Sequence, residues 1–135
     1  MNKRGWFVPI VIIAVNALAI IVRWSSLAEI LPAHFDLQGN ASGTMSRNIL
    51  LLYPFVSAAI CLIAYVVASI KHILKTGLII LSSGISLIML SSTLVSLTSG
   101  RIPVFMIAEP MILLFTVAAV IISIIKAGNV AKNSW

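Results

Sequence analysis

Residues 6–24, WFVPIVIIAVNALAIIVRW, decide the fold class of this chain. Between the two tryptophans the strongly polar side chains are only Asn16 and Arg23. A helix of about 20 residues is long enough to cross a hydrocarbon core of roughly 30 Å. The stretch therefore predicts a transmembrane helix that ends in an aromatic and basic interface anchor.

Three further stretches of similar length and character follow, at residues 49–70, 77–97 and 104–125. Hydrophobic residues make up 61% of the chain and charged residues 9%, which is far from a globular composition. In hydrocarbon each backbone polar group must be paired inside its own segment, which favours helices. We predict one all-α integral membrane domain over 1–135, an antiparallel bundle of four transmembrane helices with an external loop at 25–48.

The basic residues indicate the orientation of this bundle. Four crossings place three arginines on the side of the external loop, Arg23, Arg47 and Arg101. The other side receives a larger basic set, Lys3, Arg4, Lys71, Lys75, Lys126 and Lys132. The positive-inside rule then predicts cytoplasmic N and C termini. Membrane topology explains the net charge of +6 better than nucleic acid does, because no basic run alternates with aromatic residues.

A cleavable signal peptide is an alternative reading of the N-terminus, with Ser26 and Ala28 at the spacing of a cleavage site. The apolar run before them is longer than a usual signal core, so we favour a retained first helix. The lone Cys61 excludes an intramolecular disulfide and a cysteine-rich metal site.

Polar groups inside the spans are candidates for function. Asn16 and Arg23 are seven residues apart, and we expect their shared helix face to look into the bundle. Glu109 lies in the fourth span, where an ionisable group is costly and needs a partner, with Arg23 or Arg101 as the expected one. Alternatively, the fourth helix begins at Pro110 and leaves Glu109 beside its N-terminus.

The third span is rich in small hydroxylated residues, namely Ser82, Ser83, Ser86, Ser91, Ser92, Thr93 and Ser96. Small side chains let helices approach closely, and hydroxyls can bond to carbonyls of their own helix. We expect a central packing helix. A polar pathway is the alternative.

The external loop contains the sequence LPAHFDLQGNASGTMSR at residues 31–47. Pro32 disfavours the α region for Leu31, so the chain should run extended through His34 and Phe35. In extended backbone His34 and Asp36 share one face. Gly39-Asn40 and Ser42-Gly43 predict turns. The segment is either a structured cap or a site for a ligand or peptide, with Arg47 reaching back to Asp36 or to a lipid phosphate.

A family resemblance is visible in this loop. Pro-x-His-Phe-Asp-x-x-Gly, followed eight positions later by a basic residue, resembles the signature of the bacterial SdpI-like membrane proteins, a domain of unknown function. Its residues here are Pro32, His34, Phe35, Asp36, Gly39 and Arg47. Ser42 stands where that family commonly has an acid. The resemblance covers the first two spans and implies a bacterial cytoplasmic membrane protein of the type that gives immunity to a secreted killing peptide.

No combination of residues predicts catalysis. The sequence has no glycine-rich phosphate loop and no His-Glu-x-x-His, and one histidine with one carboxylate falls short of a metal site. We therefore expect neither an enzyme nor a cofactor, and the expected partners are the lipid bilayer and a secreted peptide or another membrane protein. The family resemblance favours a binding protein for immunity or peptide sensing. A small transporter or transporter subunit that uses Glu109 and Arg23 is the alternative.

Overall fold

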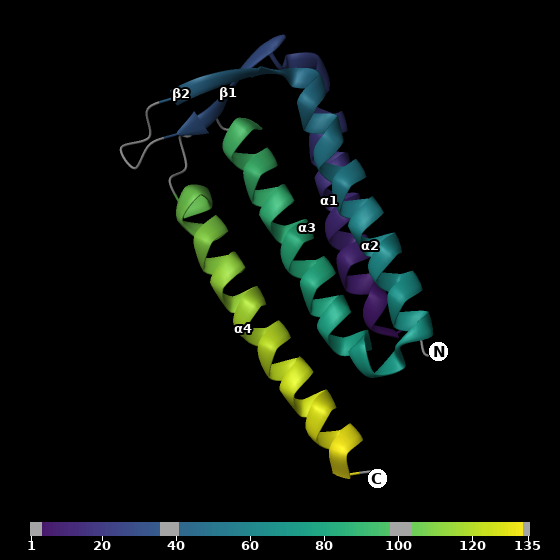
Figure 1. Cartoon of the computed structure of the whole chain (residues 1–135). Helices are drawn as coiled ribbons and strands as arrows, with labels where there is room; N and C mark the ends of the chain where they lie inside the picture. The colour runs from purple at the N-terminus through teal and green to yellow at the C-terminus, as the bar shows by residue number, and fades with distance from the viewer. Residues whose placement is uncertain (1–3, 36–40, 98–103, 134–135) are drawn as a thin grey trace.

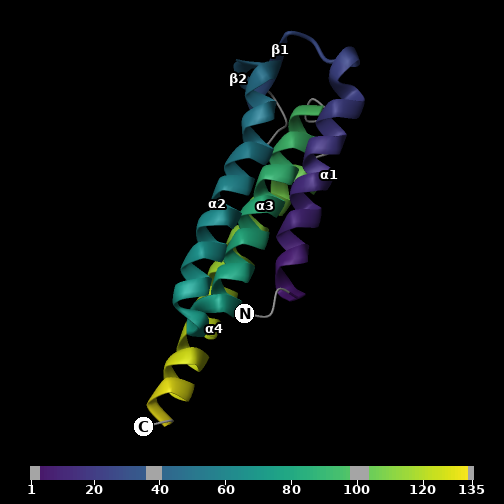
Figure 2. The ribbon, with the colours of Figure 1, turned by 90° about the vertical axis from the view of Figure 1, so that its right-hand side faces the viewer.

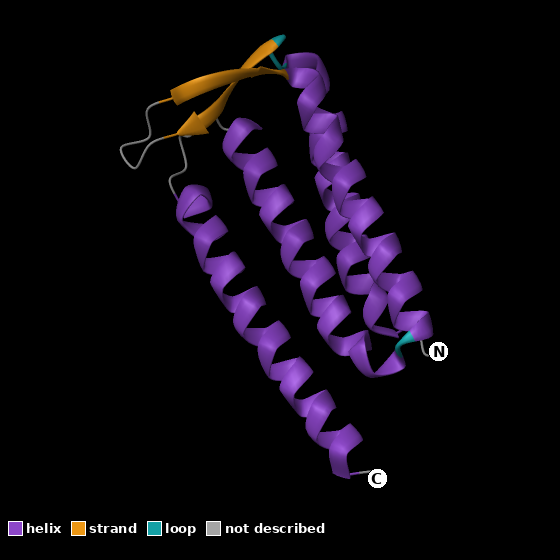
Figure 3. Ribbon diagram, viewed as in Figure 1, coloured by secondary structure: helices purple, strands orange, loops and turns teal. Residues whose placement is uncertain are grey.

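A computed structural model of the chain describes residues 4–35, 41–97 and 104–133. Its main elements are four long helices and one hairpin (Figures 1 and 3). The helices are α1 Phe7–Arg23, α2 Leu52–Ile70, α3 Lys75–Leu97 and α4 Val104–Asn133. All four are long and apolar enough to cross a membrane, which confirms the predicted class of a four-helix membrane protein.

The third helix is the centre of the assembly. α1 and α2 pack against each other and against α3, whereas α4 packs mainly against α3 (Figures 1 and 2). Consecutive helices alternate in direction (Figure 1), and the connections from α2 to α3 and from α3 to α4 are short. The result is a three-helix unit with α4 laid along its α3 side.

Both chain ends lie at the end of the bundle opposite the hairpin (Figure 1). We call the two ends the hairpin end and the terminal end. An even number of crossings accounts for the shared side of the termini. That this side is cytoplasmic remains a prediction from the distribution of basic residues.

A two-stranded antiparallel hairpin caps the bundle between α1 and α2. Its strands are β1 Ile30–Phe35 and β2 Ala41–Ser46. The extended course predicted from Pro32 is confirmed. Ser42 and Gly43, predicted as a turn, belong instead to β2, where Gly43 pairs with His34 and the strand continues on both sides.

The fourth helix differs from its prediction at two places. It continues to Asn133, past residue 125, and Gly128 lies inside it with open space around its backbone. Pro110 also lies inside the helix, six residues after its start at Val104, so the alternative that the helix begins at Pro110 is wrong. Pro110 lies beyond the first turn, where an ordinary residue would donate its amide to the carbonyl four residues earlier, so it removes one intrahelical hydrogen bond.

Two apolar clusters hold the three-helix unit together. Towards the terminal end, Trp6 packs with Cys61, Ala64 and Ala68, and its ring meets Tyr65 edge-on at 5.4 Å between centroids. At the hairpin end the buried side chains come from three segments: Ile20 of α1, Leu31 of β1, and Leu50 of the short 3-10 helix η3, Arg47–Leu51. The hairpin is therefore part of the core through Leu31.

Candidate functional site at the hairpin end

The motif residues of the external loop lie along β1. Pro32 is opposite Thr44, His34 is opposite Gly43, and Phe35 is opposite Ala41. Asp36 and Gly39 lie outside the residues that the structure describes, so the predicted shared face of His34 and Asp36 stays a prediction. The hairpin places Pro32, His34 and Phe35 on one strand, each opposite a residue of β2.

The ladder is irregular on either side of His34. The register shifts between Pro32 and His34 and again between His34 and Phe35, so Ala33 and Ser42 have no opposite residue within the described hairpin. Extra residues of this kind bend a strand, increase its twist and redirect its side chains, and they are frequent beside functional sites. The irregular pairing therefore coincides with the His-Phe part of the motif.

Arg47 anchors the hairpin to the end of α1. It begins η3, Arg47–Leu51, directly after β2. Its guanidinium donates to the carbonyl oxygens of Trp24 and Leu27 at 3.5 and 3.2 Å and stacks over the Trp24 ring at 4.8 Å. Its backbone amide donates to the Glu29 carbonyl at 2.9 Å. Arg47 thus ties together the two chain segments that enter and leave the hairpin.

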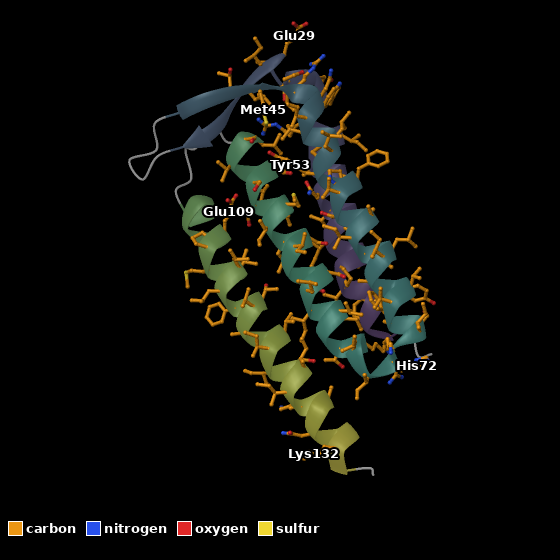
Figure 4. The ribbon with its side chains drawn as sticks, in the orientation of Figure 1. Glu29, Met45, Tyr53, His72, Glu109 and Lys132 are labelled. Atoms are coloured by element: carbon orange, nitrogen blue, oxygen red, sulfur yellow. The ribbon has the colours of Figure 1, made fainter. Side chains whose placement is uncertain are left out.

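A second contact fixes the hairpin to α2. The Tyr53 hydroxyl donates to the Met45 sulfur at 3.9 Å, and both side chains pack against the cluster of Ile20, Leu31 and Leu50 (Figure 4). Sulfur is a weak acceptor, so packing provides most of this contact. The base of the hairpin is consequently held by α1, η3 and α2 together.

The outer surface beside this base is mixed apolar and acidic. Ile30 is 66% exposed at the start of β1, and the neighbouring Glu29 side chain extends away from the bundle (Figure 4). An exposed aliphatic group next to a carboxylate can contact both the apolar and the cationic parts of an amphipathic partner.

Glu109 lies in α4 beside the hairpin end of α3. Its Oε1 accepts a hydrogen bond from the Ser92 hydroxyl at 2.7 Å, and the side chain is half-buried. The predicted ion pair with Arg23 is not found among the described residues. Arg23 is exposed at the end of α1, and α3 lies between α1 and α4 (Figure 1). Arg101, the other expected partner, lies outside the described residues.

Glu109 belongs to a polar row on α4 that the sequence analysis missed. Glu109, Thr116 and Ser123 are seven residues apart and lie beside the α3 residues Ser92, Gly84 and Gly77. The residues of α4 are seven apart and those of α3 are seven and eight apart, and this repeated spacing of polar or small residues in two successive spans is the sequence signal that could have revealed the interface. We call these six residues the α3–α4 seam.

Asn16 is the most unusual polar group inside the bundle. It is completely buried, and neither its amide nitrogen nor its amide oxygen has a hydrogen-bond partner within the described structure. It shares its helix face with the buried Pro9 and Ile20, so this part of the predicted face looks into the bundle, whereas Arg23, expected on the same inward face, is exposed. An unpaired buried amide costs free energy and calls for a structural or functional explanation.

Comparison with known families matches part of the chain. Residues 11–58 match the family described as Domain of unknown function (DUF1648). The match begins in α1, includes both hairpin strands and η3, and ends in the first turns of α2. No curated protein and no solved structure matches the chain. The matched segment contains every motif residue of the hairpin and Asn16, whereas Glu109 lies outside it.

Proposed function

We propose that this protein is a binding protein of the bacterial cytoplasmic membrane that gives immunity to, or senses, a membrane-active peptide. The observation that carries the proposal is the anchored hairpin. Arg47 fixes its base through two backbone carbonyls and Trp24, while the Pro-x-His-Phe motif occupies an irregular part of its ladder. A rigid base under a recognition loop reduces the ordering cost of binding.

The surface around the hairpin supports the choice of a peptide as ligand. Membrane-active peptides combine an apolar face with cationic side chains. The exposed Ile30 and the outward Glu29 provide complementary contacts at this end. The matched domain of unknown function covers the same segment, and the resemblance of its motif to SdpI-like proteins supports the immunity form of the proposal.

Peptide challenge tests this function. Bacteria that express the full chain should survive secreted killing-peptide fractions, and a synthetic cationic amphipathic peptide, better than bacteria carrying an empty vector. His34→Ala should remove this protection without reducing the amount of protein in the membrane. Asn48→Ala, at an exposed residue of η3, is the control and should retain it. Equal survival with and without the protein in every challenge would contradict immunity.

A second candidate function is a small transporter or transporter subunit. The half-buried Glu109 and the unpaired amide of Asn16 favour it, because polar groups at membrane depth often mark solute pathways. Transport predicts solute flux in proteoliposomes that Glu109→Gln abolishes. Immunity predicts a survival difference without such flux, so the two measurements separate the candidates.

A further inference from the structure

A groove opens between the first turns of α3 and the C-terminal half of α4, at the terminal end of the bundle. Its volume is about 560 Å³. The apolar part of its lining comes from Ile73 and Ile80 on one side and from Ala119 and Ile122 on the other. Ile73 and Ile122 are about half exposed, so the groove faces the surroundings of the bundle rather than its core. Within a membrane this surface meets acyl chains.

Polar groups complete the lining of the same groove. Thr76 contributes from α3, and Ser123 and Lys126 contribute from α4. Ser123 and Lys126 are three residues apart and therefore lie on one helix face. Lys126 is exposed, so its ammonium group is accessible from the membrane surface. The groove thus joins aliphatic walls to two hydroxyl donors and a cation.

Charge at the terminal end of the bundle fits an anionic occupant. Lys71, His72 and Lys132 are exposed at this end (Figure 4). The described carboxylates, Glu29 and Glu109, belong to the other half of the molecule (Figure 4). A phosphate group held by Lys126 would therefore face no nearby carboxylate among the described residues. Basic pockets between transmembrane helices are a known way to hold anionic lipid headgroups.

A second groove at this end provides an internal comparison. It lies between α1 and α2, also has a volume of about 560 Å³, and is lined by Trp6, Ile10, Leu62 and Tyr65 among others. Its lining contains no charged side chain. Both grooves can contact acyl chains, but only the groove beside Lys126 offers a charge to a headgroup.

We propose that the groove between α3 and α4 binds an anionic phospholipid. One acyl chain lies against Ile80 and Ala119, and the headgroup phosphate accepts hydrogen bonds from Lys126, Thr76 and Ser123. This site is separate from the hairpin and does not depend on the peptide-binding proposal. It uses the length of α4, which brings Lys126 beside the start of α3.

Lipid retention by the purified full chain tests the site. The protein is equilibrated with phosphatidylglycerol or phosphatidylcholine of identical acyl chains, and bound lipid is counted by native mass spectrometry. Phosphatidylglycerol should be retained preferentially, and Lys126→Gln should reduce its retention about fivefold, the effect expected for one surface cation. Lys126→Arg should preserve retention. Lys132→Gln, on the same helix but outside the groove, is the matched control and should change retention little.

A second pair of variants tests the apolar part of the groove. Ala119→Phe fills the groove and should reduce retention of phosphatidylglycerol, whereas Ala118→Phe, at the exposed neighbouring position, should not. If Ala119→Phe fails to fold, the retention measured for Lys126→Gln tests the proposal, because that exposed side chain can be replaced without repacking the helices. Equal retention of the two lipids, or equal loss in the Lys126 and Lys132 variants, would overturn the proposal. Full displacement by inorganic phosphate would also overturn it, since the site would then hold an anion rather than a lipid.

Discussion

The small and hydroxylated residues of α3 pack differently on the side that faces α4 and on the opposite side. Towards α4, α3 presents Gly77, Gly84 and Ser92, and each meets a polar side chain of the neighbouring helix. On the opposite side, by the 3.6-residue helical repeat, it presents the buried hydroxyls of Ser82, Ser86 and Thr93. These three donate to carbonyl oxygens four residues earlier in α3 itself. α4 is thus joined to α3 by contacts between side chains and backbone of the two helices. On the opposite side of α3 the hydroxyl groups instead donate their hydrogen bonds within α3 itself.

The two sides of α3 also differ in how buried polar groups are paired. The seam to α4 supplies Ser92 as a donor for the Glu109 carboxylate. On the other side, the self-bonded hydroxyls of α3 do not donate to Asn16, which is completely buried in α1. A row of hydroxyls in a membrane helix is therefore not automatically a polar pathway. The bonds of Ser82, Ser86 and Thr93 agree with the packing role expected for this helix.

Gly84→Ala should produce the largest effect, because it disrupts the packing of α4 against α3. A Cβ at Gly84 would lie 2.7 Å from the Cβ of Thr116 and closer still to its outer atoms, so the helices must separate. We expect a loss of about 2–3 kcal/mol in unfolding free energy, measured by thermal unfolding in detergent. Gly77→Ala is the matched control, because its Cβ would lie 3.5 Å from the Ser123 oxygen, an ordinary contact. It should be neutral or slightly stabilising through helix propensity.

The combination of Gly84→Ala with Thr116→Gly moves the bulk of the contact from one helix to the other. It should recover part of the lost stability. Equal losses for the alanine variants at Gly77 and Gly84 would show that close approach at Thr116 does not determine this interface.

Asn16→Leu tests the other side of α3 and should stabilise the bundle. Replacing an unpaired buried amide with an apolar side chain of similar size removes its desolvation cost, for a gain of about 1–2 kcal/mol. Thermal unfolding in detergent measures this gain. Ser82→Ala is the control, since the Ser82 hydroxyl bonds only to its own helix at 2.8 Å. A marked loss of stability in Asn16→Leu would mean that the amide has a partner in the membrane.

A double-mutant cycle between Ser92 and Glu109 should give the smallest effect. With Ser92→Ala and Glu109→Gln, we expect a coupling free energy of about 1 kcal/mol in thermal unfolding, typical of a hydrogen bond between membrane helices. Ser91→Ala with Glu109→Gln is the control cycle, because Ser91 is buried nearby without a bond to Glu109. Additive effects in both cycles would show that the hydrogen bond between Ser92 and Glu109 does not stabilise the packing of α4 against α3.

Sequence reasoning predicted the helices well because the membrane imposes their length. The predicted first span 6–24 compares with Phe7–Arg23, and the predicted second span 49–70 with Leu52–Ile70. The start of α4 at Val104 also agrees, but its end does not. Past residue 125 the chain becomes more polar, so hydropathy no longer marks the end of a helix that continues into the polar region.

The candidate site was predicted only in part. Pro32 restricts the residue before it, so an extended segment at Leu31 followed from local backbone sterics. The pairing of His34 with Gly43 depends on strand register, which involves residues far apart in the chain and cannot be derived from either strand alone. The same limit applied to Arg47, whose contacts with Trp24 and Leu27 join residues on either side of the hairpin.

By itself the sequence determined four membrane helices, their alternating directions and an extended segment after Pro32. These features follow from hydrocarbon thickness, backbone hydrogen bonding and proline sterics, all of which act within a short stretch of chain. The tertiary structure decided that Glu109 bonds to Ser92 rather than to Arg23, and that Arg47 clamps the hairpin. The identity of a partner depends on which helix lies beside which, and that choice is made by packing across α3, where Gly84 lets α4 approach.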